Sequence, residues 1–146
     1  MRVVNFGKIS IKNFLSVGSE PVCINFKPGI HIITGINKDK QDRRNGVGKS
    51  TIADSIHFAI FGTTIRELSK DNIVNNLIGS GTEVILEFSI DSDQYKIVRM
   101  LKPSKCFLYI NGVDSTRDSM TNTTDYICKL LDTTQEIFQN CVIMTV

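Results

Sequence analysis

The sequence lacks tryptophan altogether and has only three prolines, two histidines and four cysteines among its 146 residues. No Cys-x-x-Cys pair is present, which excludes the common structural zinc motifs. Because Cys23 and Cys141 lie in apolar, strand-like runs, we expect reduced thiols packed in the core. His31 is predicted to lie in a strand and His57 in a helix. They are far apart in the sequence, so we expect structural roles for both.

Long apolar runs and a strong charge bias are also missing. No run approaches the roughly 20 residues needed to span a membrane, and Met1 to Lys8 has no signal-peptide apolar core. The formal net charge is only +2, too small to indicate nucleic-acid binding by itself. The sequence therefore predicts one soluble globular domain, located in the cytoplasm, with no membrane partner.

One motif is present that carries chemistry, the run Asn-Gly-Val-Gly-Lys-Ser-Thr from Asn45 to Thr51. An apolar run, Ile30 to Thr34, precedes it, and a helix-like run, Ile52 to Phe61, follows it. A strand, a glycine-rich loop with Gly-Lys-Ser and then a helix are typical of the phosphate-binding (Walker A) loop of nucleoside triphosphatases. The alternative, a glycine turn before an amphipathic helix, fits the complete motif less well.

The motif gives each residue a role. Glycines let main-chain N–H groups close around phosphate oxygens, and the helix N-terminus adds unpaired donors. Lys49 supplies a positive charge for the β- and γ-phosphates, and the Ser50 hydroxyl is placed to ligate Mg²⁺. The predicted phosphate-binding residues are Gly46, Val47, Gly48, Lys49, Ser50 and Thr51.

The loop departs from the strict motif, which has glycine where Arg43 stands. Gly35, in Thr34-Gly35-Ile36-Asn37, lies eight residues earlier. We interpret Gly35 as the true start of the loop, followed by an insertion of roughly 38–45. We favour a solvent-exposed surface loop for this charged insertion over a segment that contacts nucleotide or DNA.

Hydrophobic periodicity predicts an α/β domain. Strands are expected at 3–14, 22–26, 30–34, 82–90, 95–100 and 107–110, with a tight turn at Asn111-Gly112 and a short return at Val113. The strand at 30–34 should be central in its sheet, and the later strands should form an antiparallel meander. Helices are expected at 52–61, ending at Gly62, near 71–74, at 126–131 after N-caps in 121–124, and at 135–140. The chain stops within a strand-like run, 141–146, which suggests truncation.

These pieces together resemble a known family. The segments Ile11–Gly18, Ile33–Gly35, Gly46–Thr51 and Phe58–Gly62 are similar to the N-terminal ATPase lobe of the SMC-like DNA repair ATPases. The similarity is strongest to the SbcC-like type and to the ATPase subunits of bacteriophage recombination endonucleases. The runs 86–88, 95–99 and 109–112 also look like that family. The resemblance implies that 1–146 is the N-terminal lobe of an ABC-type P-loop ATPase head, with a mixed central sheet and an antiparallel meander.

The family implies ATP and Mg²⁺ as cofactors, and as partners a nuclease subunit, DNA and a second ATPase head in a homodimer. It also implies a coiled coil and a C-terminal lobe that carries the catalytic acid and the signature motif. This chain has neither a heptad run nor an apolar strand ending in paired acids after the loop. We therefore expect no catalytic residue in it and ATP hydrolysis only by the full-length protein. Alternatives are another ABC-type ATPase (SMC, RecF-like or transporter-type) and a nucleotide-binding module without turnover.

The resemblance adds further candidate residues. Lys12 matches a basic position near the nucleotide, with an outward-facing strand lysine as the alternative. Asn37 and Asn45 compete for the asparagine of the loop. The slot of the family glutamine that senses Mg²⁺ falls at Val146, with Gln139 as a weaker candidate. Weak candidates for DNA-backbone contacts are Arg66, Lys70, Lys102 and Lys105.

Overall fold

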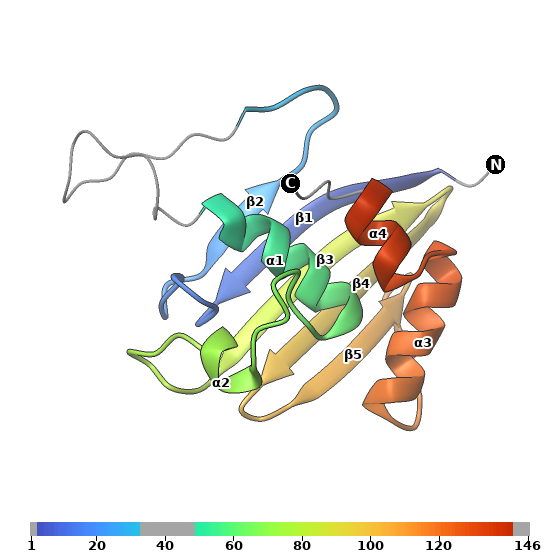
Figure 1. Cartoon of the computed structure of the whole chain (residues 1–146). Helices are drawn as coiled ribbons and strands as arrows, with labels where there is room; N and C mark the ends of the chain where they lie inside the picture. The colour runs from blue at the N-terminus through green and yellow to red at the C-terminus, as the bar shows by residue number, and fades with distance from the viewer. Residues whose placement is uncertain (1–2, 33–48, 142–146) are drawn as a thin grey trace.

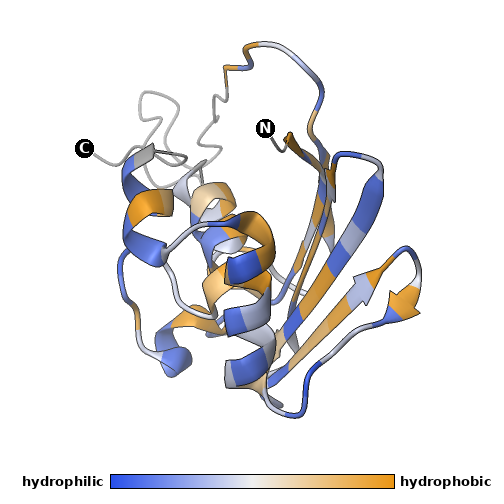
Figure 2. Cartoon of the chain, turned by 90° about the vertical axis from the view of Figure 1, so that its right-hand side faces the viewer, coloured by the Kyte–Doolittle hydropathy of each residue, from blue (hydrophilic) through white to orange (hydrophobic). Residues whose placement is uncertain are grey.

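The computed structural model describes residues 3–32 and 49–141, without the side chains of Lys49 and Cys141. The chain forms two layers, a six-stranded sheet and a set of helices on one of its faces (Figures 1 and 2). The strands are β1 (Val4–Lys12), β2 (Val22–Asn25), β3 (Thr82–Ile90), β4 (Asp93–Leu101), β5 (Lys105–Ile110) and β6 (Val113–Asp114). The helices are α1 (Lys49–Phe61), α2 (Lys70–Ile73), α3 (Met120–Leu131) and α4 (Gln135–Cys141).

The predicted antiparallel meander is confirmed. The strand order is β2-β1-β3-β4-β5-β6, and each neighbouring pair is antiparallel. Buried and half-buried residues alternate strictly along β3, as expected of a strand with one face against a core. Asn111 and Gly112, which join β5 to β6, both have positive φ, 50° and 80°, as a tight hairpin turn of this type requires.

The expected central strand at 30–34 is wrong over its described part. Ile30 to Ile32 form no strand, and the side chains of Ile30 and Ile32 are 97% and 87% exposed. The turn at Pro28-Gly29, where Gly29 has φ 110°, takes the chain away from β2, and no strand of the described residues pairs with 30–32. An extended apolar segment needs such a neighbour to satisfy its main-chain groups. The sheet is accordingly antiparallel throughout its described strands rather than mixed.

Helix α1 follows its prediction in extent but not in the width of its buried face. It ends at Gly62, whose φ of 81° and hydrogen bond from its N–H to the Phe58 carbonyl confirm the expected glycine stop. The predicted apolar face held Ile52, Ile56, Ala59 and Ile60, but Ile52 and Ile56 are only half-buried. Polar residues Asp54, Ser55 and His57 are buried instead.

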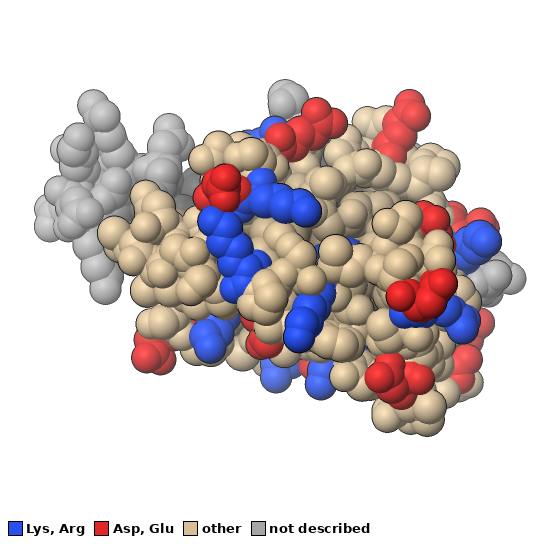
Figure 3. All heavy atoms as spheres, turned by 90° about the horizontal axis from the view of Figure 1, so that it is seen from below, with Lys and Arg blue, Asp and Glu red and all other residues tan. Residues whose placement is uncertain are grey.

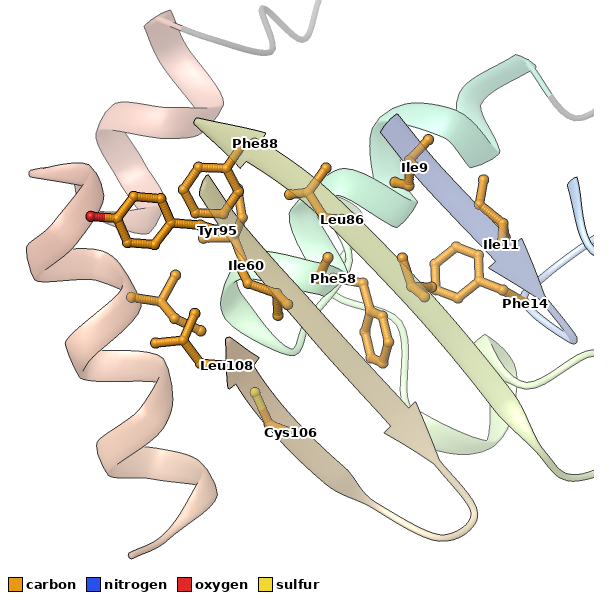
Figure 4. Packing of buried hydrophobic residues seen from close by; sticks show 14 of the residues in the cluster. Ile9, Ile11, Phe14, Phe58, Ile60, Leu86, Phe88, Tyr95, Cys106 and Leu108 are labelled. Atoms are coloured by element: carbon orange, nitrogen blue, oxygen red, sulfur yellow. The ribbon is translucent and has the colours of Figure 1, made fainter. Parts of the chain in front are cut away.

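The core fills the space between the helices and the inner face of the sheet. Phe58 and Ile60 of α1 contribute to it, together with Leu86, Phe88 and Leu108 of the strands (Figure 4). The Phe14 and Phe58 rings lie with centroids 5.3 Å apart, and Phe88 stacks on Tyr95 at 5.2 Å. The first contact holds α1 against the turn that follows β1, and the second joins the neighbouring strands β3 and β4.

Three smaller predictions are corrected. Cys23 of β2 is exposed rather than buried, because it pairs with Ser10 on the sheet face away from the buried Ile9 and Ile11. His31 lies outside any strand, exposed, with its Nε2 2.8 Å from the Lys27 carbonyl oxygen. Helix α3 begins earlier than predicted, with Ser119 as its N-cap, whose hydroxyl accepts from the Asn122 N–H. The run 142–146 lies outside the described residues.

Candidate nucleotide-binding site

The first turn of α1 contains the last residues of the predicted phosphate-binding motif. Lys49 is the first helical residue, Ser50 is exposed, and Thr51 is 5% exposed. The first N–H groups of a helix have no intrahelical partner, and this first turn contains no acidic residue that would repel a phosphate. Gly35, Asn37, Asn45, Gly46, Val47 and Gly48 lie outside the described residues.

A tight turn after β1, residues 13–18, lies against the first turn of α1. The Ser16 hydroxyl is 3.2 Å from the Thr51 hydroxyl. The Asn13 N–H donates to the Gly18 carbonyl, and Phe14 and Val17 exchange main-chain hydrogen bonds. The sequence analysis included these residues in the segment that resembles the family. It did not predict their contact with the helix, because Ser16 and Thr51 are 35 residues apart in the sequence.

A buried acid in the second turn of α1 is already neutralised. Asp54 is 2% exposed, and its carboxylate accepts from the Ile65 N–H at 3.0 Å and from the Arg66 guanidinium at 2.8 and 3.0 Å. A charge-assisted pair of this kind satisfies the buried carboxylate. The helix thus keeps an acid close to its N-terminus without presenting a free negative charge to a bound anion.

The C-terminal end of α1 is held by a buried cation, Arg99 of β4. Its guanidinium donates to the Ala59 carbonyl at 3.2 Å, the Ile60 carbonyl at 2.9 Å and the Thr124 hydroxyl at 3.0 Å. Burial lowers the pKa of Arg99 from its usual value. A positive charge at the C-terminus complements the helix dipole, and the donors satisfy carbonyls that have no partner inside the helix. No sequence pattern identified this role.

His57 connects α1 to α4. Its Nδ1 lies 2.6 Å from the Thr63 carbonyl oxygen and its Nε2 lies 3.0 Å from the Gln139 Nε2. A carbonyl only accepts, so Nδ1 carries the proton and Nε2 accepts from the Gln139 amide. Burial is the largest effect and lowers the pKa of His57, whereas the Thr63 hydrogen bond and the Asp54 charge act to raise it. The structural role expected for His57 is consistent with these contacts, and Gln139 lies on a helix beside α1.

The basic candidate residues are dispersed. Lys12 ends β1 opposite Glu83, on the sheet face away from the buried Ile9 and Ile11, which favours the outward-facing alternative. Arg66 pairs with Asp54, and Lys102 pairs with Asp71 at 2.7 Å. Lys70 and Lys105 are exposed. On the face seen from below, Lys and Arg are interspersed with Asp and Glu (Figure 3), so the charges drawn on that face are of mixed sign.

Two kinds of feature are absent from the described part of the chain. It contains no group of three or more His, Cys, Asp or Glu side chains arranged to hold a metal ion. Among the same residues, no helix combines the length and the apolar character that crossing a bilayer requires.

Comparison with known proteins gives a consistent result. The model of the AAA domain family matches residues 8–143. The chain is 31% identical over 113 residues to exonuclease subunit 2 of Enterobacteria phage T4, covering 77% of this chain and 19% of that protein. It is 28% identical over 128 residues to the DNA double-strand break repair Rad50 ATPase of Methanosarcina mazei, covering 80% and 11%. The chain thus spans about a fifth or less of the length of these relatives.

Among solved structures, the chain resembles the Smc head domain of Pyrococcus furiosus, in a crystal structure with the C-terminal domain of ScpA. The TM-score is 0.65 at 26% identity, over 92% of this chain and 35% of that one. The α/β fold predicted from the sequence is confirmed at this level. The chain belongs to the AAA domain family, is homologous to the phage exonuclease subunits and Rad50 ATPases, and has the fold of an SMC-type ATPase head.

Proposed function

We propose that this chain is the ATP-binding N-terminal part of a DNA repair and recombination ATPase that works with a partner nuclease on double-strand breaks. One observation carries the nucleotide part of the proposal. The Gly-Val-Gly-Lys-Ser-Thr motif leads directly into α1, whose first turn holds Ser50 and Thr51 and contains no acid. This combination fits a polyphosphate, because the helix end offers unpaired N–H donors and a positive dipole end.

The chain's own residues would divide the binding as follows. The main-chain N–H groups of 46–51 surround the phosphates, the Lys49 ammonium contacts the β- and γ-phosphates, and the Ser50 hydroxyl ligates the metal. Mg²⁺ held there would supply positive charge that offsets the negative charge of the phosphates. The Asp54 carboxylate already forms an ion pair with Arg66 and accepts a hydrogen bond from the Ile65 N–H, so it is not available as a metal ligand. The residue that activates water is assigned to another part of the full-length protein.

The DNA and nuclease parts of the proposal depend on the relatives. One is named an exonuclease subunit and the other a double-strand break repair ATPase. By this likeness the full-length protein would pair two ATPase heads around ATP and act beside a nuclease subunit on DNA. An ATPase head of this kind binds nucleotide in one lobe and completes the site with the other, so we expect this chain alone to bind ATP with negligible turnover.

The nucleotide assignment is tested by Lys49→Ala. Loss of a charge-assisted phosphate contact, worth about 1.5 to 3 kcal/mol, should weaken ATP affinity about tenfold to a hundredfold. Lys129→Ala, on the exposed side of α3, is the matched control and should leave the affinity unchanged. Binding is measured by titration with a fluorescent ATP analogue in the presence of Mg²⁺. Equal affinities of the wild type and Lys49→Ala would reject the assignment.

A further inference from the structure

We propose that Ser16 is a positioning residue for the nucleotide: its hydroxyl donates to Thr51 and thereby directs the Thr51 hydroxyl toward the phosphates. This inference rests on the proposed ATP-binding function. The two hydroxyl oxygens are 3.2 Å apart, and either can donate in the absence of other constraints. Ser16 itself is exposed, and Thr51 is 5% exposed, so the pair connects a buried hydroxyl to the surface at the start of α1.

The direction of the hydrogen bond follows from the chemistry of an anion. Side chains on a helix lean toward its N-terminus, which places Thr51 over the end where phosphate would bind. A phosphate oxygen only accepts hydrogen bonds. A Thr51 hydroxyl that binds phosphate must therefore donate its single O–H to it. Thr51 can then only accept from its other neighbour, and Ser16 must be the donor. Such a chain of two hydroxyls is cooperative, because each bond polarises the next.

The turn that carries Ser16 is braced from outside the nucleotide site. The Leu15 N–H donates to the Ile73 carbonyl, and the Asn75 side-chain amide donates to the Leu15 carbonyl at 2.8 Å. Leu15 has a φ of 50°, a left-handed conformation that these two contacts hold in place. The turn that carries Ser16 is therefore held by the end of α2 and the residues that follow it, rather than by α1. A donor fixed in this way orients Thr51 without a change in α1 itself.

The expected effect is modest and specific. A neutral hydrogen bond contributes about 0.5 to 1.5 kcal/mol, so Ser16→Ala should weaken ATP affinity about threefold to tenfold. Ser16→Thr keeps the hydroxyl and should restore most of the affinity. Because Ser16 is exposed, the free energy of unfolding without nucleotide should be nearly unchanged in both variants. Ser19→Ala, an exposed serine three residues further along, is the matched control and should bind as the wild type does.

A double-mutant cycle with Thr51→Val tests the inference. If Ser16 acts through Thr51, Ser16→Ala should cost nothing further in a Thr51→Val background, and the two losses should not add. Affinity is measured by titration with a fluorescent ATP analogue and Mg²⁺, and stability by urea unfolding without nucleotide. Folding of each variant is thereby assessed separately from binding.

The possible results distinguish the positioning role of Ser16 from the proposed ATP-binding function. If the wild type binds no ATP, the proposed function fails. If the wild type binds but Ser16→Ala binds equally well, or if the Ser16 and Thr51 losses add fully, only the positioning role fails. A loss of affinity in Ser16→Ala that matches an equal loss of unfolding free energy would also overturn it, since that result indicates a purely structural contact.

Discussion

Replacement of Arg99 by methionine tests how α1 is held in the fold. Arg99 is 5% exposed and donates to two main-chain carbonyls at the end of α1 and to the Thr124 hydroxyl of α3. Methionine preserves much of the buried apolar stem but removes all these donors. The carbonyls of Ala59 and Ile60 would then be buried without these partners, each at the desolvation cost of a polar group.

The magnitude follows from these contacts. Leaving two buried carbonyls unpaired costs about 1 to 3 kcal/mol each, partly offset because the charged guanidinium no longer has to be buried. We expect Arg99→Met to lower the free energy of unfolding by about 3 kcal/mol. In a chain of this size that corresponds to a fall in the melting temperature of about 10 °C.

Urea unfolding followed by circular dichroism measures the effect. Thr124→Val removes one acceptor of Arg99 and should cost only about 1 kcal/mol, which separates the helix-end contacts from the contact with α3. Gly62→Ala provides a second comparison, because a Cβ there would lie 3.2 Å from the Arg99 Nη1 at a φ of 81°. If Arg99→Met is as stable as the wild type, the guanidinium does not anchor α1 and the reasoning is refuted.

Two further predictions follow from the buried His57 and from the exposed Cys23. The pKa of His57 is lowered below 6.5, so the unfolded chain takes up the proton first, and the free energy of unfolding should be highest above pH 6.5 and fall as the pH decreases through and below it. His57→Phe should remove this part of the pH dependence between pH 7 and 5 in urea titrations, and identical profiles would contradict the assignment. Burial raises the pKa of Cys106, whereas Cys23 is exposed, so a thiol reagent should modify Cys23 much faster than Cys106 in the native chain, as mapped by mass spectrometry. Equal rates at the two sites would show that the sheet does not protect Cys106.

Local patterns predicted much of this fold. Alternation of apolar residues located β3 to the residue, and glycine stops located the end of α1 and the turn between β5 and β6. The same reasoning failed at 30–32 and at Cys23, where apolar character suggested burial. Both segments lie where the described sheet offers no covering neighbour, and a local pattern does not record which neighbours the chain supplies.

The sequence by itself determined the phosphate-binding motif, the helix that follows it and the family, because glycine placement and hydrophobic period act within a few residues. Only the tertiary structure decided which side chains serve that helix. Ser16 reaches Thr51 across 35 residues, Arg99 reaches Ala59 across 40, and Gln139 reaches His57 across 82. These contacts depend on how the turn after β1, strand β4 and helix α4 pack around α1. A polar side chain buried by that packing is stabilised only by whichever partner the fold brings within hydrogen-bonding distance.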